Sequence, residues 1–295
     1  MSRCRVMLTG VIGHTPHIIR SMNPIDDLFQ RLRAAKRAAF MPFVTAGDPD
    51  LAFTRELLPA AAEAGADLFE DGFPFSAPIA DGPVIQASYT RALDKHLKIA
   101  DLFAMLRDVS DSFDNRGLTP PARPPLVAMA SYSLMYRKGP LAFIDAAKAA
   151  GVSGAVVPDL PVEEAEELSK LAKDRDFKLI LLVTPTTSPQ RAEKVVKACG
   201  GFVYVVSVVG ITGAREALPA ALREQLARLR TMTDLPLCVG FGVSRPEHVR
   251  DLKDIADGVI VGSAVVKMLE AAATDRAKAL ADVTQLVREL RAAIS

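Results

Sequence analysis

The chain has 295 residues, 49% of them hydrophobic and 24% charged, with 18 Gly and 20 Pro. This composition excludes a disordered, collagen-like or low-complexity chain, and the length suffices to bury a core without disulfides or metals. Lys and Arg number 36 against 35 Asp and Glu, a net charge of +1. Surfaces that bind nucleic acid or anionic membranes need a basic excess, so neither partner is expected.

The three cysteines, Cys4, Cys199 and Cys238, lie far apart and lack C-x-x-C spacing. They predict neither a disulfide framework nor a zinc site, and a reducing cytoplasm is the expected compartment. No run of the sequence reaches the roughly 20 apolar residues that span a bilayer, so no membrane segment is expected.

The first 21 residues differ from the rest of the chain. Two arginines precede a short apolar stretch, a pattern with a faint similarity to a signal peptide, but no clear cleavage site follows. We expect residues 1–21 to be a disordered N-terminal extension or an over-called start, with Met22 as the initiator. Residues 22–295 are expected to form a single catalytic domain.

From Met22 onward, short apolar runs alternate with amphipathic runs of helical period. A helix is predicted first, over 26–37. The predicted strands are 38–46, 66–73, 125–132, 154–160, 178–185, 201–208, 235–242 and 258–263. Further helices are predicted over 51–65, a run ending near Ser112, 139–151, 162–176, 188–200, 217–233, 245–256 and the C-terminal segment. Residues 114–125 are rich in proline and are predicted to be a linker.

Eight strand–helix units in about 250 residues favour an α/β fold, the (β/α)8 barrel. The strands are continuous apolar runs, as expected where both faces of a parallel sheet are buried. The extra N-terminal helix, 26–37, is expected to plug the bottom of the barrel. A doubly wound open sheet is the alternative, and it is disfavoured because no G-x-G-x-x-G turn follows the first strand.

Two carboxylates are the strongest catalytic candidates. Glu70 lies in the second predicted strand, where the barrel interior otherwise takes an apolar residue, and Asp81 follows eleven residues later in a proline-rich loop. A buried carboxylate has a raised pKa and can transfer protons near neutral pH. The neighbouring Asp71 is expected to point to the other side of the strand, as a surface or helix-facing acid. A solvated strand-end acid with an Asp-Gly turn is the alternative reading of the pair.

Glycines follow the last three predicted strands, at Gly210 to Gly213, Gly240 to Gly242, and Gly262 with Ser263. Loops in these positions form the common phosphate site of barrels, in which backbone N–H groups hold the dianion without a lysine. Ordinary strand-to-helix turns are the alternative reading.

Three further residues, Phe43, Asp159 and Tyr204, are placed by their strands near the same barrel mouth. Each is also compatible with a core or capping role. Lys178 stands at the start of a strand, and no other strand run has a lysine inside it, which disfavours a Schiff-base aldolase. No cluster of metal ligands follows the strands, so a metal-dependent aldolase is also disfavoured. Carboxylate acid–base catalysis on a phosphorylated, partly aromatic substrate remains.

Six motifs together resemble the tryptophan synthase α chain family in order and spacing, from about residue 24 to the C-terminus. They are PFVTAGDP (42–49), FEDGFPFSAPIADGPVIQ (69–86), PDLPVEE (158–164), GITG (210–213), GFGVSRPE (240–247) and VGSAVVK (261–267). The resemblance implies the (β/α)8 fold and a lyase of tryptophan biosynthesis that cleaves indole-3-glycerol phosphate to indole and glyceraldehyde 3-phosphate. It implies no cofactor in this chain, and a pyridoxal-phosphate β chain as partner in an α2β2 heterotetramer.

Site residues transfer from the family by motif. Glu70 and Asp81 match the catalytic acids. The positions that match substrate-binding residues are Phe43, Asp159, Tyr204, Thr212, Gly213, Phe241, Gly242, Gly262 and Ser263. The resemblance implies that Glu70 moves a proton between the substrate hydroxyl and indole C3 and that Asp81 stabilises charge at the indole nitrogen. Thr212 is expected to hydrogen-bond Asp81 when both loops close.

The sequence departs from the family pattern at four positions. Ala77 replaces an aspartate that lies where the α chain meets the β chain, and Asp71 replaces an apolar residue. Ser131 and Ser133 replace an aromatic residue and an asparagine. Two alternatives to the α-subunit reading therefore stay open: a regulatory subunit that turns over poorly, and a stand-alone indole-releasing lyase, which Ala77 favours.

Overall fold

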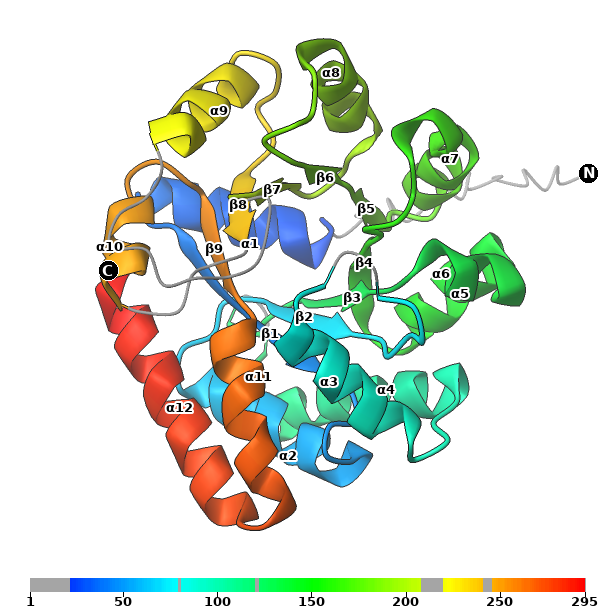
Figure 1. Cartoon of the computed structure of the whole chain (residues 1–295), viewed down its shortest axis with the longest axis vertical. Helices are drawn as coiled ribbons and strands as arrows, with labels where there is room; N and C mark the ends of the chain where they lie inside the picture. Colours follow the sequence, from blue (N-terminus) through cyan, green and yellow to red (C-terminus); the bar gives the residue numbers. More distant parts are fainter. Residues whose placement is uncertain (1–21, 79–80, 120–121, 208–219, 241–245, 295) are drawn as a thin grey trace, which may run out of the picture.

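The computed structural model describes residues 22–78, 81–119, 122–207, 220–240 and 246–294. A parallel sheet runs through this part of the chain in the order β5-β4-β3-β2-β1-β9-β8-β7-β6, with helices around its outside (Figure 1). The strands are β1 (Ala39–Thr45), β2 (Phe69–Gly72), β3 (Leu126–Met129), β4 (Val152–Val156), β5 (Lys178–Ile180), β6 (Leu182–Val183), β7 (Val203–Val206), β8 (Leu237–Gly240) and β9 (Gly258–Val261).

The longer helices are α1 (Pro24–Ala34), α2 (Leu51–Glu63), α3 (Pro83–Leu93), α4 (Ile99–Asn115), α6 (Pro140–Ala149), α7 (Glu166–Asp174), α8 (Pro189–Ala198), α9 (Ala220–Arg230) and α12 (Arg276–Ala293). The shorter ones are α5 (Tyr132–Lys138), α10 (Pro246–Leu252), α11 (Ser263–Leu269) and the 3-10 turns η1 (Val162–Glu164) and η2 (Glu270–Ala273). None of the helices in the described ranges is long and apolar enough to cross a membrane.

The sheet forms a barrel because its two ends, β5 and β6, are consecutive parts of one apolar run. β5 pairs with β4, and β6 pairs with β7. The run is interrupted at Leu181, whose N–H donates to Cys199 Sγ at 3.3 Å. The predicted (β/α)8 fold with its extra N-terminal helix is confirmed. Eight strands were predicted and nine are observed, because the interruption divides the fifth predicted strand into β5 and β6.

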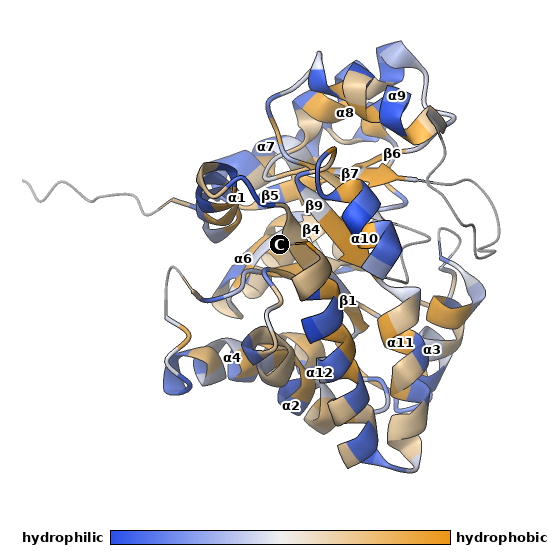
Figure 2. Ribbon diagram, turned by 90° about the vertical axis from the view of Figure 1, so that its left-hand side faces the viewer, coloured by the Kyte–Doolittle hydropathy of each residue, from blue (hydrophilic) through white to orange (hydrophobic). Residues whose placement is uncertain are grey.

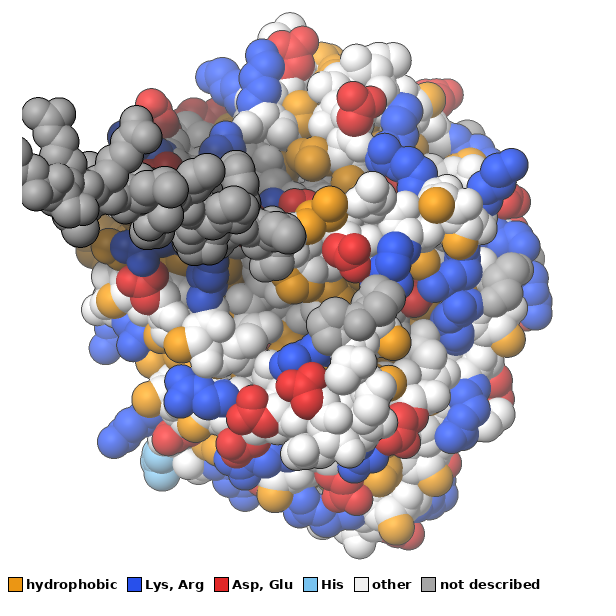
Figure 3. Space-filling view, turned by 180° about the vertical axis from the view of Figure 1, so that it is seen from behind, with side chains coloured by type: hydrophobic (Ala, Val, Ile, Leu, Met, Phe, Trp, Pro, Cys, Tyr) orange, Lys and Arg blue, Asp and Glu red, His pale blue; other side chains and the backbone are white. Residues whose placement is uncertain are grey.

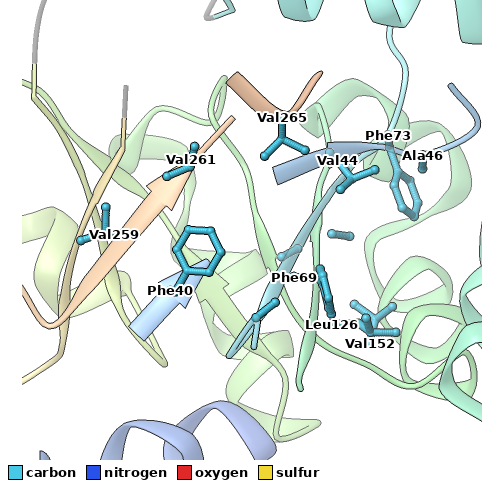
Figure 4. Packing of buried hydrophobic residues seen from close by; sticks show 14 of the residues in the cluster. Phe40, Val44, Ala46, Phe69, Phe73, Leu126, Val152, Val259, Val261 and Val265 are labelled. Carbon is cyan, nitrogen blue, oxygen red and sulfur yellow. The ribbon is translucent and has the colours of Figure 1, made fainter. Parts of the chain in front are cut away.

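Apolar side chains form two layers, one inside the barrel and one between the strands and the helices. Along β1, Met41 and Phe43 belong to the inner cluster, whereas Phe40 and Val44 belong to the outer one. Figure 4 shows part of the outer layer, and Figure 2 shows that the strands are apolar. This alternation decides which residues of each strand can reach a ligand in the barrel interior.

Helix α1 closes one end of the inner cluster, as predicted. Ile25 is fully buried, and its methyl groups reach the backbone of Gly154 and Gly201 so closely that a Cβ there would lie 3.0 to 3.1 Å away. Phe29 packs on Phe202, with ring centroids 5.9 Å apart. Because α1 lies at the N-terminal ends of the strands, their C-terminal ends are left for the site.

Several predicted boundaries differ from those in the structure. The helical run ending near Ser112 is two helices, α3 and α4, separated by a turn in which His96 has φ 56°. Residues 114–125 begin inside α4, and the third predicted strand ends at Met129, before α5. The predicted C-terminal helix is α12, with the separate helix α11 before it.

Candidate active site

Glu70 lies inside the barrel at the C-terminal half of β2. Its strand neighbours in register are Phe43 on β1 and Val127 on β3, both members of the inner cluster. The residue is 1% exposed, and neither carboxylate oxygen has a hydrogen-bond partner among the described residues. A buried carboxyl group without a partner is costly, so its retention points to a function.

Asp81 lies in the loop between β2 and α3, close enough to Glu70 for the two charges to repel. The loop is held locally: the N–H of Asp81 donates to the Pro78 carbonyl at 3.1 Å, and Gln86 Nε2 donates to the Asp81 carbonyl at 2.7 Å. The structure therefore brings together the two carboxylates that the sequence singled out.

The two carboxyl groups are tuned to different pKa values. Burial, reinforced by repulsion from Asp81 and then from Asp71, raises the pKa of Glu70 to about 8. Burial alone raises the pKa of Asp81 to about 6. Near neutral pH, Glu70 is therefore mainly protonated and Asp81 mainly ionised, which provides one acid and one base.

A small pocket that opens to solvent lies beside Asp81. Its walls are largely apolar and aromatic, with two aspartates, a tyrosine and a serine among them. The lining residues are Phe73, Phe75, Ala77, Pro78, Asp81, Tyr89, Met129, Ser131, Pro158 and Asp159. A largely apolar lining with a few polar groups is typical of sites that bind an aromatic ligand.

Two glycines make room for aromatic side chains in the barrel interior. A Cβ on Gly72 would lie 2.4 Å from Phe43 Cζ, and a Cβ on Gly240 would lie 2.3 Å from the Tyr204 hydroxyl. Tyr204 is 4% exposed, and its pKa lies well above the usual value because of burial and repulsion from Glu70 and Asp81. Phe43 and Tyr204 therefore both lie in the inner cluster, near Glu70.

Asp159 lies in the turn after β4 and lines the pocket. It accepts a hydrogen bond from Ser131 Oγ at 2.5 Å and one from the Tyr132 N–H at 2.7 Å. These bonds hold the N-terminus of α5 against the turn. Asp159 thus has a capping role in addition to its position at the pocket.

The structure describes only some of the residues predicted to bind the phosphate of the substrate. Gly262 directly precedes α11 and its Cβ position would lie 3.6 Å from the Phe43 ring, while Ser263 is the first residue of that helix. Both are half-buried, at the C-terminal end of β9. Thr212, Gly213, Phe241 and Gly242 lie outside the described residues.

Asp71 was expected to be either a surface acid or a helix-facing acid, and the structure shows that it is not on the surface. It is 0% exposed, and both of its carboxylate oxygens lack a hydrogen-bond partner within the described ranges. Its neighbours Phe69 and Phe73 belong to the outer cluster, so alternation places Asp71 on the helix-facing side of β2. Burial raises its pKa to about 8.

Tyr89 on α3 is a pocket residue that the sequence analysis missed. It is 3% exposed, belongs to the inner cluster together with Ile85, and lines the pocket with Asp81. The spacing of Ile85 and Tyr89, one helical turn apart, could have indicated that this face of α3 points into the barrel mouth.

No group of three or more His, Cys, Asp or Glu side chains in the described ranges could hold a metal ion. Figure 3 shows acidic and basic side chains interspersed over one face of the molecule.

Comparison with known proteins identifies the family of this chain. The family model described as tryptophan synthase alpha chain matches residues 29–295. The tryptophan synthase alpha chain of Rhodopirellula baltica is 47% identical over 257 residues, which cover 87% of this chain and 90% of the relative. That of Synechocystis sp. is 45% identical and covers 93% of this chain and 100% of the relative.

Solved structures agree in fold as well. The alpha subunit of tryptophan synthase from Legionella pneumophila superimposes with a TM-score of 0.82 at 32% identity, over 93% of this chain and 99% of that one. A Mycobacterium tuberculosis tryptophan synthase structure gives 0.82 at 31% identity, over the same shares of the two chains. On its fold, its motifs and these similarities, the chain belongs to the tryptophan synthase alpha chain family.

Proposed function

We propose that Glu70 transfers the protons in the reaction of this family and that Asp81 stabilises the charge that develops at the indole nitrogen. The chain is a lyase of tryptophan biosynthesis that cleaves indole-3-glycerol phosphate to indole and glyceraldehyde 3-phosphate. The observation that carries the assignment is the pair itself: a buried acid with no hydrogen-bond partner among the described residues, beside a second acid at the pocket wall.

The two pKa values suit the chemistry. Protonated Glu70 gives its proton to indole C3, which places positive charge on the ring nitrogen, and the Asp81 carboxylate accepts a hydrogen bond from that N–H. Glu70 then takes the proton of the C3′ hydroxyl. The O–H electron pair forms the aldehyde, and the pair of the C3–C3′ bond returns to the ring. Glu70 ends in the protonation state in which it began.

The remaining predicted residues are proposed to bind the two ends of the substrate. Phe43, Tyr204 and Phe241 would surround the indole, with Asp159 at the far side of the pocket. Backbone N–H groups at the phosphate end would hold the dianion. The residues proposed for that end are Gly213, Gly242, Gly262 and Ser263, with Thr212 proposed to bond Asp81.

The β chain of tryptophan synthase is the proposed partner, in an α2β2 heterotetramer in the cytoplasm. Pyridoxal phosphate would belong to that partner, and this chain needs no cofactor for the proton transfers described. Ala77 is exposed and lies on the rim of the pocket, so the missing aspartate charge would face the β chain. Coupling to β is therefore expected to differ from that of relatives with the aspartate.

The test is to incubate the purified chain with indole-3-glycerol phosphate, alone and with a β chain, and to measure both products. We expect indole and glyceraldehyde 3-phosphate in equal amounts, with a higher rate in the complex. High activity alone and no complex on gel filtration would favour a stand-alone lyase. No indole under either condition would contradict the proposal and leave a regulatory subunit.

A further inference from the structure

Tyr89 is a buried phenol to which the catalytic assignment gives no role. It projects from α3, the helix that follows the Asp81 loop, into the inner cluster of the barrel. α3 is tied to β1 beneath it, since Thr45 Oγ1 and Ser88 Oγ are hydrogen-bonded at 2.6 Å. The ring of Tyr89 is therefore held at a fixed place in the barrel mouth.

The hydroxyl of Tyr89 lies directly over Gly72 of β2. A Cβ on Gly72 would be 2.8 Å from Tyr89 Oη, so this glycine leaves the space that the phenol occupies. Glu70 precedes Gly72 by two residues, and side chains two apart on a strand share a face about 7 Å from one another. The Tyr89 hydroxyl therefore occupies the interior position next to that of Glu70.

The phenol can act only as a neutral group at this place. Burial, then repulsion from Asp81 and Glu70, holds the pKa of Tyr89 well above its ordinary value. It therefore keeps its proton throughout the pH range in which Glu70 and Asp81 titrate. The O–H group can donate one hydrogen bond to a ligand.

The hydroxyl is free to make that bond. Within the described ranges, no hydrogen bond is found for Tyr89 Oη, although the side chain is 3% exposed. The residue lines the pocket together with Asp81, and Ser131, a small side chain, also lines it. A ligand in this pocket would lie beside both Asp81 and Tyr89.

We propose that Tyr89 is a further substrate-contacting residue, whose hydroxyl donates a hydrogen bond to the C3′ oxygen of indole-3-glycerol phosphate. This inference rests on the proposed roles of Glu70 and Asp81. The C3′ hydroxyl must lie within reach of Glu70, which takes its proton, and the Tyr89 hydroxyl occupies the adjacent interior position. A donor on the C3′ oxygen turns the hydroxyl proton toward Glu70 and aligns the bond that breaks.

The test is the Tyr89→Phe variant, which keeps the ring and removes only the hydroxyl. We expect kcat/KM for indole-3-glycerol phosphate to fall about threefold to tenfold, the effect of one lost hydrogen bond to a neutral group. The inhibition constant of the 3′-deoxy analogue, which lacks the C3′ oxygen, should stay unchanged. Tyr136→Phe is the matched control, because Tyr136 is 69% exposed on α5 and is expected to leave both constants unchanged.

Two results would overturn the inference. An unchanged kcat/KM in Tyr89→Phe would show that the hydroxyl does not contact the substrate. Equal losses for substrate and 3′-deoxy analogue would assign Tyr89 a packing role. Glu70→Gln and Asp81→Asn, assayed in parallel, separate this inference from the proposed function: if those two variants are inactive while Tyr89→Phe is normal, only the role of Tyr89 fails.

Discussion

Glu70 and Asp71 are consecutive residues of β2, and both carboxyl groups are buried without a hydrogen-bond partner in the described part of the chain. Strand alternation places them on opposite faces, Glu70 toward the barrel interior and Asp71 toward the helix layer. The proposed proton transfers account for the burial of Glu70. Asp71 has no such role, so its burial should be a net cost to the fold.

Replacing Asp71 with Val should therefore stabilise the protein, more at pH 8 than at pH 5. The raised pKa of about 8 belongs to the folded state, against an ordinary value of 3.8. The folded state binds the Asp71 proton more tightly than the unfolded state does. The resulting contribution to the free energy of unfolding is complete below about pH 4 and is lost as the pH rises toward 8. Denaturant unfolding should show that Asp71→Val raises the free energy of unfolding by on the order of 3 kcal/mol more at pH 8 than at pH 5.

Asp71→Asn is the matched control for this experiment. It also removes the ionisation, so the same pH dependence should disappear, but it keeps a buried amide without a partner and should be less stable than the Val variant. Equal stability of the wild type and both variants at pH 8 would show that Asp71 is not an unpaired buried acid.

The pH profile of kcat/KM should be bell-shaped, with a maximum near the midpoint of the two catalytic pKa values. Activity should rise as Asp81 ionises, with a pKa of about 6, and fall as Glu70 loses its proton, with a pKa of about 8. Because the two groups repel, the limbs report apparent values of the pair. A profile that is flat between pH 5 and 9 would disprove the acid and base assignment.

Arg91 should stabilise the position of α3, the helix that contains Tyr89. Its guanidinium makes two hydrogen bonds, at 2.9 and 2.7 Å, to Asp48, which is 0% exposed. Arg91→Met leaves that carboxylate buried and unpaired, at a cost of about 3 kcal/mol. Because α3 carries Tyr89 and follows the Asp81 loop, KM should also rise.

Two further variants make this prediction specific. Arg91→Lys restores the charge but not the paired hydrogen bonds, and should recover only part of the stability. Arg55→Met removes an ion pair with Asp108 in which both side chains are exposed, at 41% and 56%, and should cost less than about 1 kcal/mol. Similar losses in Arg91→Met and Arg55→Met would argue against a structural role for the buried pair.

The sequence predicted those features that follow from the residue pattern within a single strand or strand–helix unit. An acid inside an apolar run identified Glu70, and the eight alternating units identified the barrel. The interruption at Leu181 could not be predicted, because it depends on a hydrogen bond to Cys199 at the end of α8. Ser131 caps α5 and donates a hydrogen bond to Asp159, a contact with another loop that the sequence of this segment does not indicate.

Tyr89 escaped prediction for a similar reason. Its importance comes from Gly72 on a different element, whose missing side chain admits the phenol to the interior. Asp71 was predicted to lie on the opposite side of the strand from Glu70, but its complete burial depends on how the helices pack over β2. Contacts between elements, rather than patterns within one, account for the features that were missed.

Indole release by Glu70→Gln and Asp81→Asn, compared with the exposed controls Glu166→Gln and Asp94→Asn, tests the central claim most directly. Each substitution is nearly isosteric, so unfolding profiles should stay cooperative in all four variants. The account predicts at least about a 100-fold loss of kcat in Glu70→Gln and Asp81→Asn and wild-type rates in the controls. Wild-type indole release by either Glu70→Gln or Asp81→Asn would contradict it.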